Sequence, residues 1–366
     1  MRRIWAAIAI TTLTFLSLPA AQASTTIILT EPTHREINGE FIDDELATSL
    51  SATGRLGNLV FNPPTGVTRW IIDPALIEEV TAMANGYTLI SGGVGTGQLI
   101  AKTWLSQLKL VTTSRSVKAL AYGNPSSYWV SRLSPHEANY VLTISQARLS
   151  KLLNRPVGAA SAYHSHSRFT ILNSDILSLK SDSTYFAQTL SYIDPTTIDT
   201  YRFALIKIFN PSLTVDRREF LIRDYTSVAY AQIHLVHLSS GKFTVTATHQ
   251  NLPITVTNGF PTNIKINLYV FPTNLKLQVG HLEPLIIPAN SKVQVMVPIT
   301  ALTSGSSGLS VELTTSQGNL IGDQILYPIK ISVISPIATW FTTGAAIVLF
   351  LAATIQSVRR IRRRQK

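Results

Sequence analysis

The chain has 366 residues, no cysteine and a formal net charge of +11. Without cysteine it cannot contain a disulfide, a cysteine metal site or a thiol nucleophile. Eight of the cations lie at the two ends of the chain, in segments typical of targeting and anchoring, and without these eight the net charge is +3. The positive charge therefore does not indicate a nucleic-acid partner, and we expect none.

Residues 1–23 have the order of a secretory signal peptide. Arg2 and Arg3 precede an apolar stretch, Ile4 to Leu18, and a small-residue triplet ends at Ala23. This order predicts export of the chain and cleavage after Ala23. An uncleaved anchor is the alternative, although the apolar stretch is short for spanning a membrane.

Residues 24–225 alternate between apolar, β-branched runs and stretches with helical spacing. Such alternation predicts an α/β head domain in which helices cover a mainly parallel sheet, and it leaves open whether the sheet closes as a degenerate barrel. Helices are expected at residues 44–59, 74–84, 98–110, 135–153, 184–192 and 216–225. Strands are expected at residues 67–72, 117–121, 158–162, 169–172 and 201–209.

Asp73 follows one of these predicted strands directly and precedes Pro74. Two interpretations are open. At the carboxyl end of a buried strand, a carboxylate stands where α/β proteins bind ligands. Asp followed by Pro is also a helix start, with Asp73 as the N-cap and Pro74 at the first helical position. The helix cap is the simpler interpretation, and Asp73 is a candidate ligand-binding residue.

Asn124 follows the predicted strand at residues 117–121 and is a second candidate ligand-binding residue. Its amide can hydrogen-bond to a sugar hydroxyl. It cannot act as a general acid or base, because the amide does not titrate.

His164 and His166 are the remaining candidates, since alternate residues of a strand point to the same face. Zinc usually takes at least three protein ligands. With Asp73 or Asp175, the two histidines would resemble the Asp-His-His set of a deacetylase, and a solvated pair of loop histidines is the alternative. The sequence therefore predicts no bound metal, no cofactor and no assigned catalytic residue.

Residues 226–241 are expected to form a linker, because the pattern changes there to short alternating strands with period two. Residues 242–335 are predicted to form an immunoglobulin-like β-sandwich that acts as a stalk. Its strands are expected at residues 243–247, 254–257, 264–271, 275–279, 293–299, 309–315 and 325–334.

Ile337 to Val358 is a run of 22 residues without a charge, and six cations follow it in residues 359–366. At a rise of about 1.5 Å per residue the run is roughly 33 Å long, enough to cross a bilayer core of about 30 Å. Basic segments stay in the cytoplasm, where they bind anionic lipid headgroups. The sequence predicts a single-pass protein of the cell membrane, with the bulk of the chain outside and a short cytoplasmic tail; a buried core helix is the alternative.

One known family has a set of motifs that this chain shares, and these motifs lie in both halves of the chain. The motifs are residues 54–59, 66–76, 104–105, 121–125, 275–277, 287–291 and 295–299. With these motifs the chain resembles an uncharacterised family of secreted, C-terminally membrane-anchored actinobacterial cell-envelope proteins, a domain of unknown function. The resemblance implies a location in the cell envelope and assigns no catalytic residue. The chain departs from the family in lacking a further N-terminal β-domain and in having Asn124 where members usually have Asp.

Two functions follow as hypotheses. The first is non-catalytic binding of a wall polysaccharide or an envelope protein by the predicted head. The second is a carbohydrate-active enzyme, a glycosidase or polysaccharide deacetylase, which would need Asp73 in an open cleft beside a second carboxylate or the histidine pair.

Overall fold

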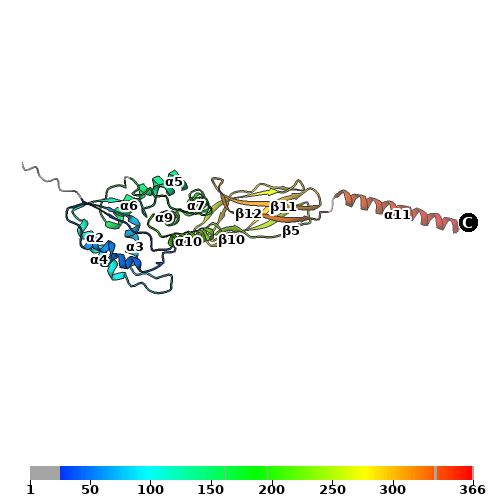
Figure 1. Ribbon diagram of the computed structural model, residues 1–366. Helices are drawn as coiled ribbons and strands as arrows, with labels where there is room; N and C mark the ends of the chain where they lie inside the picture. Colours follow the sequence, from blue (N-terminus) through cyan, green and yellow to red (C-terminus); the bar gives the residue numbers. More distant parts are fainter. Residues whose placement is uncertain (1–24, 161, 196, 334–335, 365–366) are drawn as a thin grey trace, which may run out of the picture. The chain divides into compact units, whose positions relative to one another are not determined.

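The computed structural model describes residues 25–160, 162–195, 197–333 and 336–364 (Figure 1). The predicted signal peptide lies outside the described residues. The chain divides into two compact units, which are named by their order. The first unit comprises residues 1–34, 41–122 and 141–164, and the second comprises residues 35–40, 123–140 and 165–366.

Three short strands form the sheet of the first unit. The strands β1 (Thr25–Leu29), β2 (Val67–Ile72) and β3 (Ser116–Ala119) pair in that order, and both pairings are parallel. The helices of this unit are α1 (Glu45–Leu50), α2 (Arg55–Phe61), α3 (Pro74–Ala84), α4 (Gln98–Thr112) and the C-terminal part of α6 (Pro135–Leu153). Sheet and helices share one core, in which Trp104 donates its indole N–H to the carbonyl of Leu56 at 3.1 Å.

The second unit begins with helices. They are α5 (Ser127–Leu133), α7 (Asn173–Tyr185), the π-helix η1 (Phe186–Leu190), α8 (Ser191–Ile193), α9 (Ile198–Ile208) and α10 (Val215–Ile233). Asn319 donates a side-chain N–H to the carbonyl of Gln188 at 2.7 Å, and Thr189 donates its hydroxyl to the carbonyl of Leu320 at 3.3 Å. These bonds attach the π-helix to the strand-rich part of the same unit.

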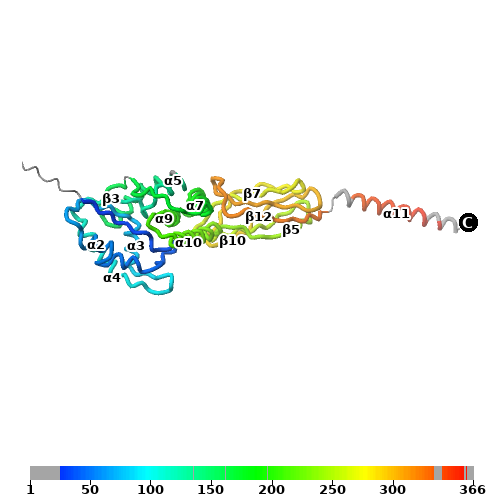
Figure 2. Tube along the Cα trace, viewed as in Figure 1, coloured from blue at the N-terminus to red at the C-terminus, as the bar shows by residue number. Residues whose placement is uncertain are grey.

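The strand-rich part of the second unit is a β-sandwich, which occupies the yellow and orange part of the chain in Figure 2. One sheet has the order β4–β6–β10–β8 and the other β5–β12–β11–β7–β9. The strands are β4 (Val236–Leu238), β5 (Phe243–Val245), β6 (His249–Asn258), β7 (Ile264–Pro272), β8 (Leu277–Val279), β9 (Leu285–Ile287), β10 (Ser291–Ala301), β11 (Gly305–Thr315) and β12 (Leu320–Ile331). Asn258 at the end of β6 donates to the carbonyl of Ile287 at 3.2 Å, which joins the two sheets.

The predicted fold class, with an α/β head built on a mainly parallel sheet, is wrong. Most strands of the described chain lie in the two sheets of the sandwich, where all pairings except β5 with β12 are antiparallel. Among the other named strands of the described residues, parallel pairing is limited to the three short strands of the first unit. Three strands cannot close a barrel, since the smallest barrels need many more.

The error comes from residues 155–209, because the described residues of this stretch form none of the strands expected at residues 158–162, 169–172 and 201–209. The last of these is helix α9. Its buried Ile198, Tyr201, Leu205 and Ile208 follow helical spacing, while the same stretch also alternates with period two. The predicted linker likewise carries the end of α10 and strand β4. The division into domains at residues 24–225 and 242–335 stays a prediction.

The C-terminal segment is helical, as predicted. Helix α11 (Pro336–Arg364) contains the apolar stretch Trp340–Ser357, in which no side chain is buried. Within the described part of the chain, it is the one helix long and apolar enough to cross a membrane.

Candidate functional site

Asp73 lies at the junction of β2 and α3 and is fully buried. One carboxylate oxygen accepts the backbone N–H of Ala75 at 2.9 Å, and Thr30 donates its hydroxyl to the other at 3.5 Å. The Asp73 N–H donates to the carbonyl of Leu29 at 2.9 Å. Asp73 therefore caps α3 and fixes the end of β2 beside β1. Its assignment as a ligand-binding residue stays a prediction.

Asn124 lies in a tight turn of the second unit, and its side chain is buried. Its φ is +44° and that of Gly123 is +72°, a conformation that asparagine and glycine adopt more readily than other residues. Asn210 donates to the carbonyl of Gly123 at 2.9 Å and holds the turn. Within the described residues, the side-chain oxygen of Asn124 has no hydrogen-bond partner. Ligand binding by Asn124 also stays a prediction.

His164 and His166 are both exposed, and the segment that contains them is not a regular strand. His166 shares a hydrogen bond of 2.6 Å with the hydroxyl of Ser127. Among the described residues, the one group of histidine and carboxylate side chains close enough to share a metal ion contains none of the four predicted residues. The structure thus provides no strand face on which the two imidazoles would lie together.

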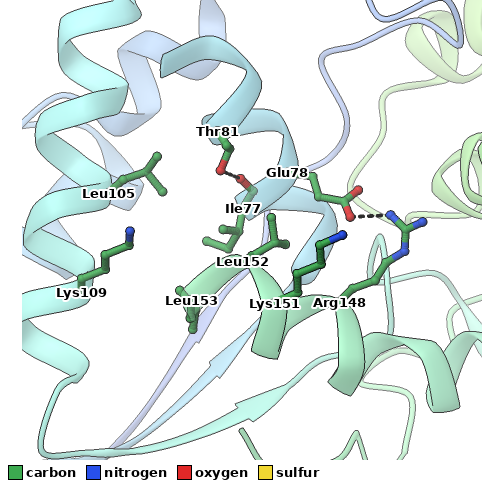
Figure 3. Close-up of a pocket in the computed structure, with 9 residues that line it drawn as sticks. All are labelled: Ile77, Glu78, Thr81, Leu105, Lys109, Arg148, Lys151, Leu152 and Leu153. Atoms are coloured by element: carbon green, nitrogen blue, oxygen red, sulfur yellow. Dashed lines mark hydrogen bonds and ion pairs between the residues drawn. The ribbon is translucent and has the colours of Figure 1, made fainter. Parts of the chain in front are cut away.

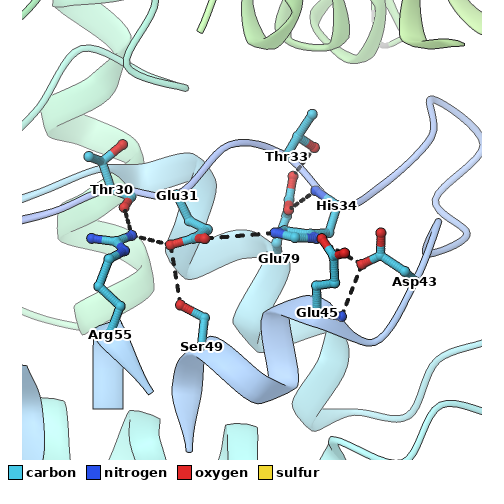
Figure 4. Close-up of polar contacts among 9 residues, drawn as sticks. All are labelled: Thr30, Glu31, Thr33, His34, Asp43, Glu45, Ser49, Arg55 and Glu79. Carbon is cyan, nitrogen blue, oxygen red and sulfur yellow. Dashed lines mark hydrogen bonds and ion pairs between the residues drawn. The ribbon is translucent and has the colours of Figure 1, made fainter. Parts of the chain in front are cut away.

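That group is part of a buried cluster in the first unit, which we call the His34 cluster (Figure 4). Figure 4 shows the His34 ring between Asp43 on one side and Glu31 on the other, at 2.9 Å from Nδ1 and 4.0 Å from Nε2. The backbone N–H of His34 donates to Glu79 of α3 at 3.0 Å, and Thr33 donates its hydroxyl to the same carboxylate.

Electrostatics make His34 a cation in this cluster. Burial by itself lowers the pKa of His34, but the hydrogen bond to Asp43 and the nearby carboxylates of Glu31 and Glu79 outweigh it and raise the pKa to about 9. Burial raises the pKa of Glu31, but the nearby His34 and Arg55 outweigh burial and lower this pKa below its ordinary value.

His34, Asp43 and Glu45 offer ligand atoms that all lie within 4.8 Å of one another. A metal must displace the proton of the imidazole before it binds there. With a pKa of about 9, His34 keeps that proton at neutral pH. The arrangement therefore suits an imidazolium held by carboxylates better than a metal ion.

A pocket of about 520 Å³ opens between helices α3, α4 and α6 of the first unit (Figure 3). We call it the three-helix pocket. Its lining residues are Ile77, Glu78, Thr81, Leu105, Lys109, Arg148, Lys151, Leu152 and Leu153. The volume lies in the range of small-ligand sites, about 300–1,000 Å³.

The single carboxylate of the three-helix pocket is already bonded. Arg148 donates to Glu78 at 2.5 Å, and the Tyr122 hydroxyl donates to the other oxygen of Glu78 at 2.6 Å. In the described structure, the ammonium groups of Lys109 and Lys151 have no hydrogen bond or ion pair. The pocket therefore carries two uncompensated cations above an apolar floor of isoleucine and leucine.

Sequence reasoning missed both sites. Glu79 lies 45 residues from His34, and the three-helix pocket draws on residues from Ile77 to Leu153. The available signal for the cluster was the charge density of residues 31–45.

Several solved structures resemble about a quarter of the chain. The C. elegans protein WR4, a member of the MSP family, is 10% identical, with 26% of this chain and 97% of that chain covered and a TM-score of 0.21. The PapD-like domain 7 of human CEP192 is 11% identical, with coverages of 27% and 85% and a TM-score of 0.22. The E. coli alpha-2-macroglobulin is 14% identical, with coverages of 26% and 6% and a TM-score of 0.22. Such low scores imply nothing about function.

None of the curated proteins matches the chain. A family model does match, over residues 97–365, and these residues make up more than half of the sequence. The match begins at Gly97, directly before α4, and continues through the sandwich and α11. The chain therefore belongs to DUF6049, a family of unknown function.

Proposed function

We propose that the protein is an exported, single-pass membrane protein that binds a wall polysaccharide or an envelope partner without chemically changing it. The observation that carries this proposal is helix α11, whose apolar stretch Trp340–Ser357 is entirely exposed. In water this surface is unfavourable, whereas in a bilayer it is solvated by lipid.

The direction of insertion follows from charge. The arginines directly behind the apolar stretch favour the cytoplasmic side, where they meet anionic lipid headgroups. All residues before α11 then lie outside the cell. The predicted signal peptide supports the same direction, because it would export the N-terminus.

The surroundings of the carboxylates support binding without turnover. Asp73 is bonded as a helix cap, and Glu79 is bonded within the His34 cluster. The three-helix pocket contains one carboxylate, Glu78, which is paired with Arg148. Hydrolysis of a glycoside normally needs two carboxyl groups, one on each side of the bond. Binding is therefore the function that this arrangement supports best.

A cysteine-free chain allows a direct test of topology. We would introduce Lys292→Cys in the sandwich or Gln365→Cys in the tail and treat intact cells with a membrane-impermeant maleimide. We expect labelling of the first variant, and labelling of the second only after the membrane is made permeable. Equal labelling of both in intact cells, or recovery of the protein in the soluble fraction, would overturn the proposed anchoring.

A further inference from the structure

We infer that the three-helix pocket binds an anionic group, a phosphate or a carboxylate, carried on a partly apolar molecule. The inference rests on the proposed function, because it names the site and the ligand chemistry for that binding. It starts from the two ammonium groups of Lys109 on α4 and Lys151 on α6, which line the pocket from different helices.

Charge complementarity is the first step. Arg148 forms an ion pair with Glu78, and its guanidinium lies 5.6 Å from the centre of the Tyr122 ring. Tyr122 in turn holds Glu78 through its hydroxyl. This triad is neutral in the sum of its side-chain charges, so the two lysines set the charge of the pocket. A concave site lined by one sign of charge concentrates ligands of the opposite sign.

The lysines also fit the geometry of an anion. An ammonium is a compact point charge with three donors on a flexible stem, so it can follow a phosphate or carboxylate of varied shape. Both lysines are exposed at their tips and lack a bonded carboxylate in the described structure. Their charge is therefore available to a ligand without breaking an existing pair.

The apolar residues on the floor of the pocket determine which kind of molecule can carry the anionic group. Figure 3 shows Leu105 of α4 facing Ile77 and Leu152 across the pocket. Ile77 and Leu153 are buried, and Leu105 and Leu152 are half-buried. Apolar surface here is covered favourably by hydrocarbon or by the C–H face of a sugar. A small inorganic anion would leave this floor in contact with water, so we expect it to bind weakly.

Two sources carry this chemistry, an acidic glycan and a lipid headgroup, and soluble probes distinguish them. We would titrate the full-length protein in detergent with an oligoglucuronate and with dihexanoyl phosphatidate. The neutral probes of matched size are a glucose oligomer and dihexanoyl phosphatidylcholine. Dihexanoylglycerol, which has no phosphate, replaces dihexanoyl phosphatidylcholine as the neutral partner of phosphatidate where the choline lipid binds through its own phosphate. We expect at least one anionic probe to bind at least tenfold more tightly than its uncharged partner, and the tighter anionic probe identifies the source.

The matched variants are Lys109→Glu with Lys151→Glu, and Lys102→Glu on the same α4 but outside the pocket lining. We expect the double variant to lose binding at least tenfold and Lys102→Glu to change it less than twofold. Lys109→Gln with Lys151→Gln tests the same point if the charge reversal does not fold. Equal affinity for neutral and anionic probes, no binding of either anionic probe, or unchanged binding by the double variant would overturn the inference. If neither anionic probe binds while the wild-type protein still retains wall polysaccharide, the pocket inference fails and the proposed function stands.

Discussion

Glu78 and Glu79 are adjacent on α3 but lie in two regions where charged side chains have different roles. Glu79 is buried and bonded by Thr33 and by the backbone of His34 in the His34 cluster. Glu78 is partly exposed and lines the three-helix pocket, where two lysines have no bonded partner in the described structure. Removing one partner of a buried, paired charge destabilises the fold, whereas a charge left unpaired at a concave surface remains available to a ligand.

The comparison predicts the largest effect for Glu79→Ala. The variant removes the buried carboxylate that accepts the Thr33 hydroxyl and the backbone N–H of His34, which costs about 3–4 kcal/mol of the free energy of unfolding. The matched control is Glu78→Ala, where a partly exposed pair is lost, with an expected cost of about 1 kcal/mol or less. Hydrogen–deuterium exchange of α3 peptides in the full-length protein measures both. Equal losses in the free energy of unfolding for Glu79→Ala and Glu78→Ala would contradict the distinction between the two regions.

The His34 cluster also predicts a pH dependence. Because the folded-state pKa of His34 is about 9 and its ordinary value is 6.5, its contribution is complete below pH 6.5 and is lost as pH rises through 9. The expected loss in the free energy of unfolding across this window is on the order of 2–3 kcal/mol. Unfolding by denaturant at several pH values tests it, with His34→Gln as the control that should flatten the curve. A wild-type curve as flat as that of the variant would contradict the assignment.

Asp73 gives a smaller effect, since it supports one helix end. Asp73→Ala removes the acceptor of the Ala75 N–H and should cost about 1–2 kcal/mol. Asp73→Asn keeps an effective cap and should cost only a few tenths of a kcal/mol. Thermal unfolding monitored by circular dichroism distinguishes the two. A cost of Asp73→Asn as large as that of Asp73→Ala would show that the charge of Asp73 matters beyond capping.

The pocket lysines should contribute least to stability. Lys109→Glu and Lys151→Glu are expected to change the free energy of unfolding by about 0.5 kcal/mol or less, because exposed substitutions away from structural contacts have small effects. Thermal unfolding monitored by circular dichroism measures this change in stability. A loss of several kcal/mol would place these lysines with the His34 cluster as structural charges.

The local elements with strong signals were predicted correctly from the sequence. Strand β2, helix α3 and helix α6 have the predicted bounds, because their apolar spacing and the Asp73-Pro74 start are local properties. Helix α9 was predicted as a strand, since its apolar residues fit both periods. Strand β1 was missed because its pairing with β2 depends on a partner about 40 residues away.

The polar sites were harder to predict for a related reason. The roles of Glu79 and Lys151 depend on side chains from other elements, and no spacing in the sequence brings those together. Asp73 was found because its cap is a local pattern of two residues. Sequence reasoning therefore found the charge that serves a local structure and missed the charges that act through tertiary contacts.

Incubation of the full-length protein in detergent with purified wall polysaccharide, and separately with immobilised envelope proteins, tests binding without turnover most directly. Co-sedimentation measures retention, and mass spectrometry of the polysaccharide measures any change. The account predicts that the protein is retained and that the polysaccharide is recovered with its mass, linkage and acetylation unchanged. Release of shortened or deacetylated fragments, or no retention by either wall polysaccharide or envelope proteins, would contradict it.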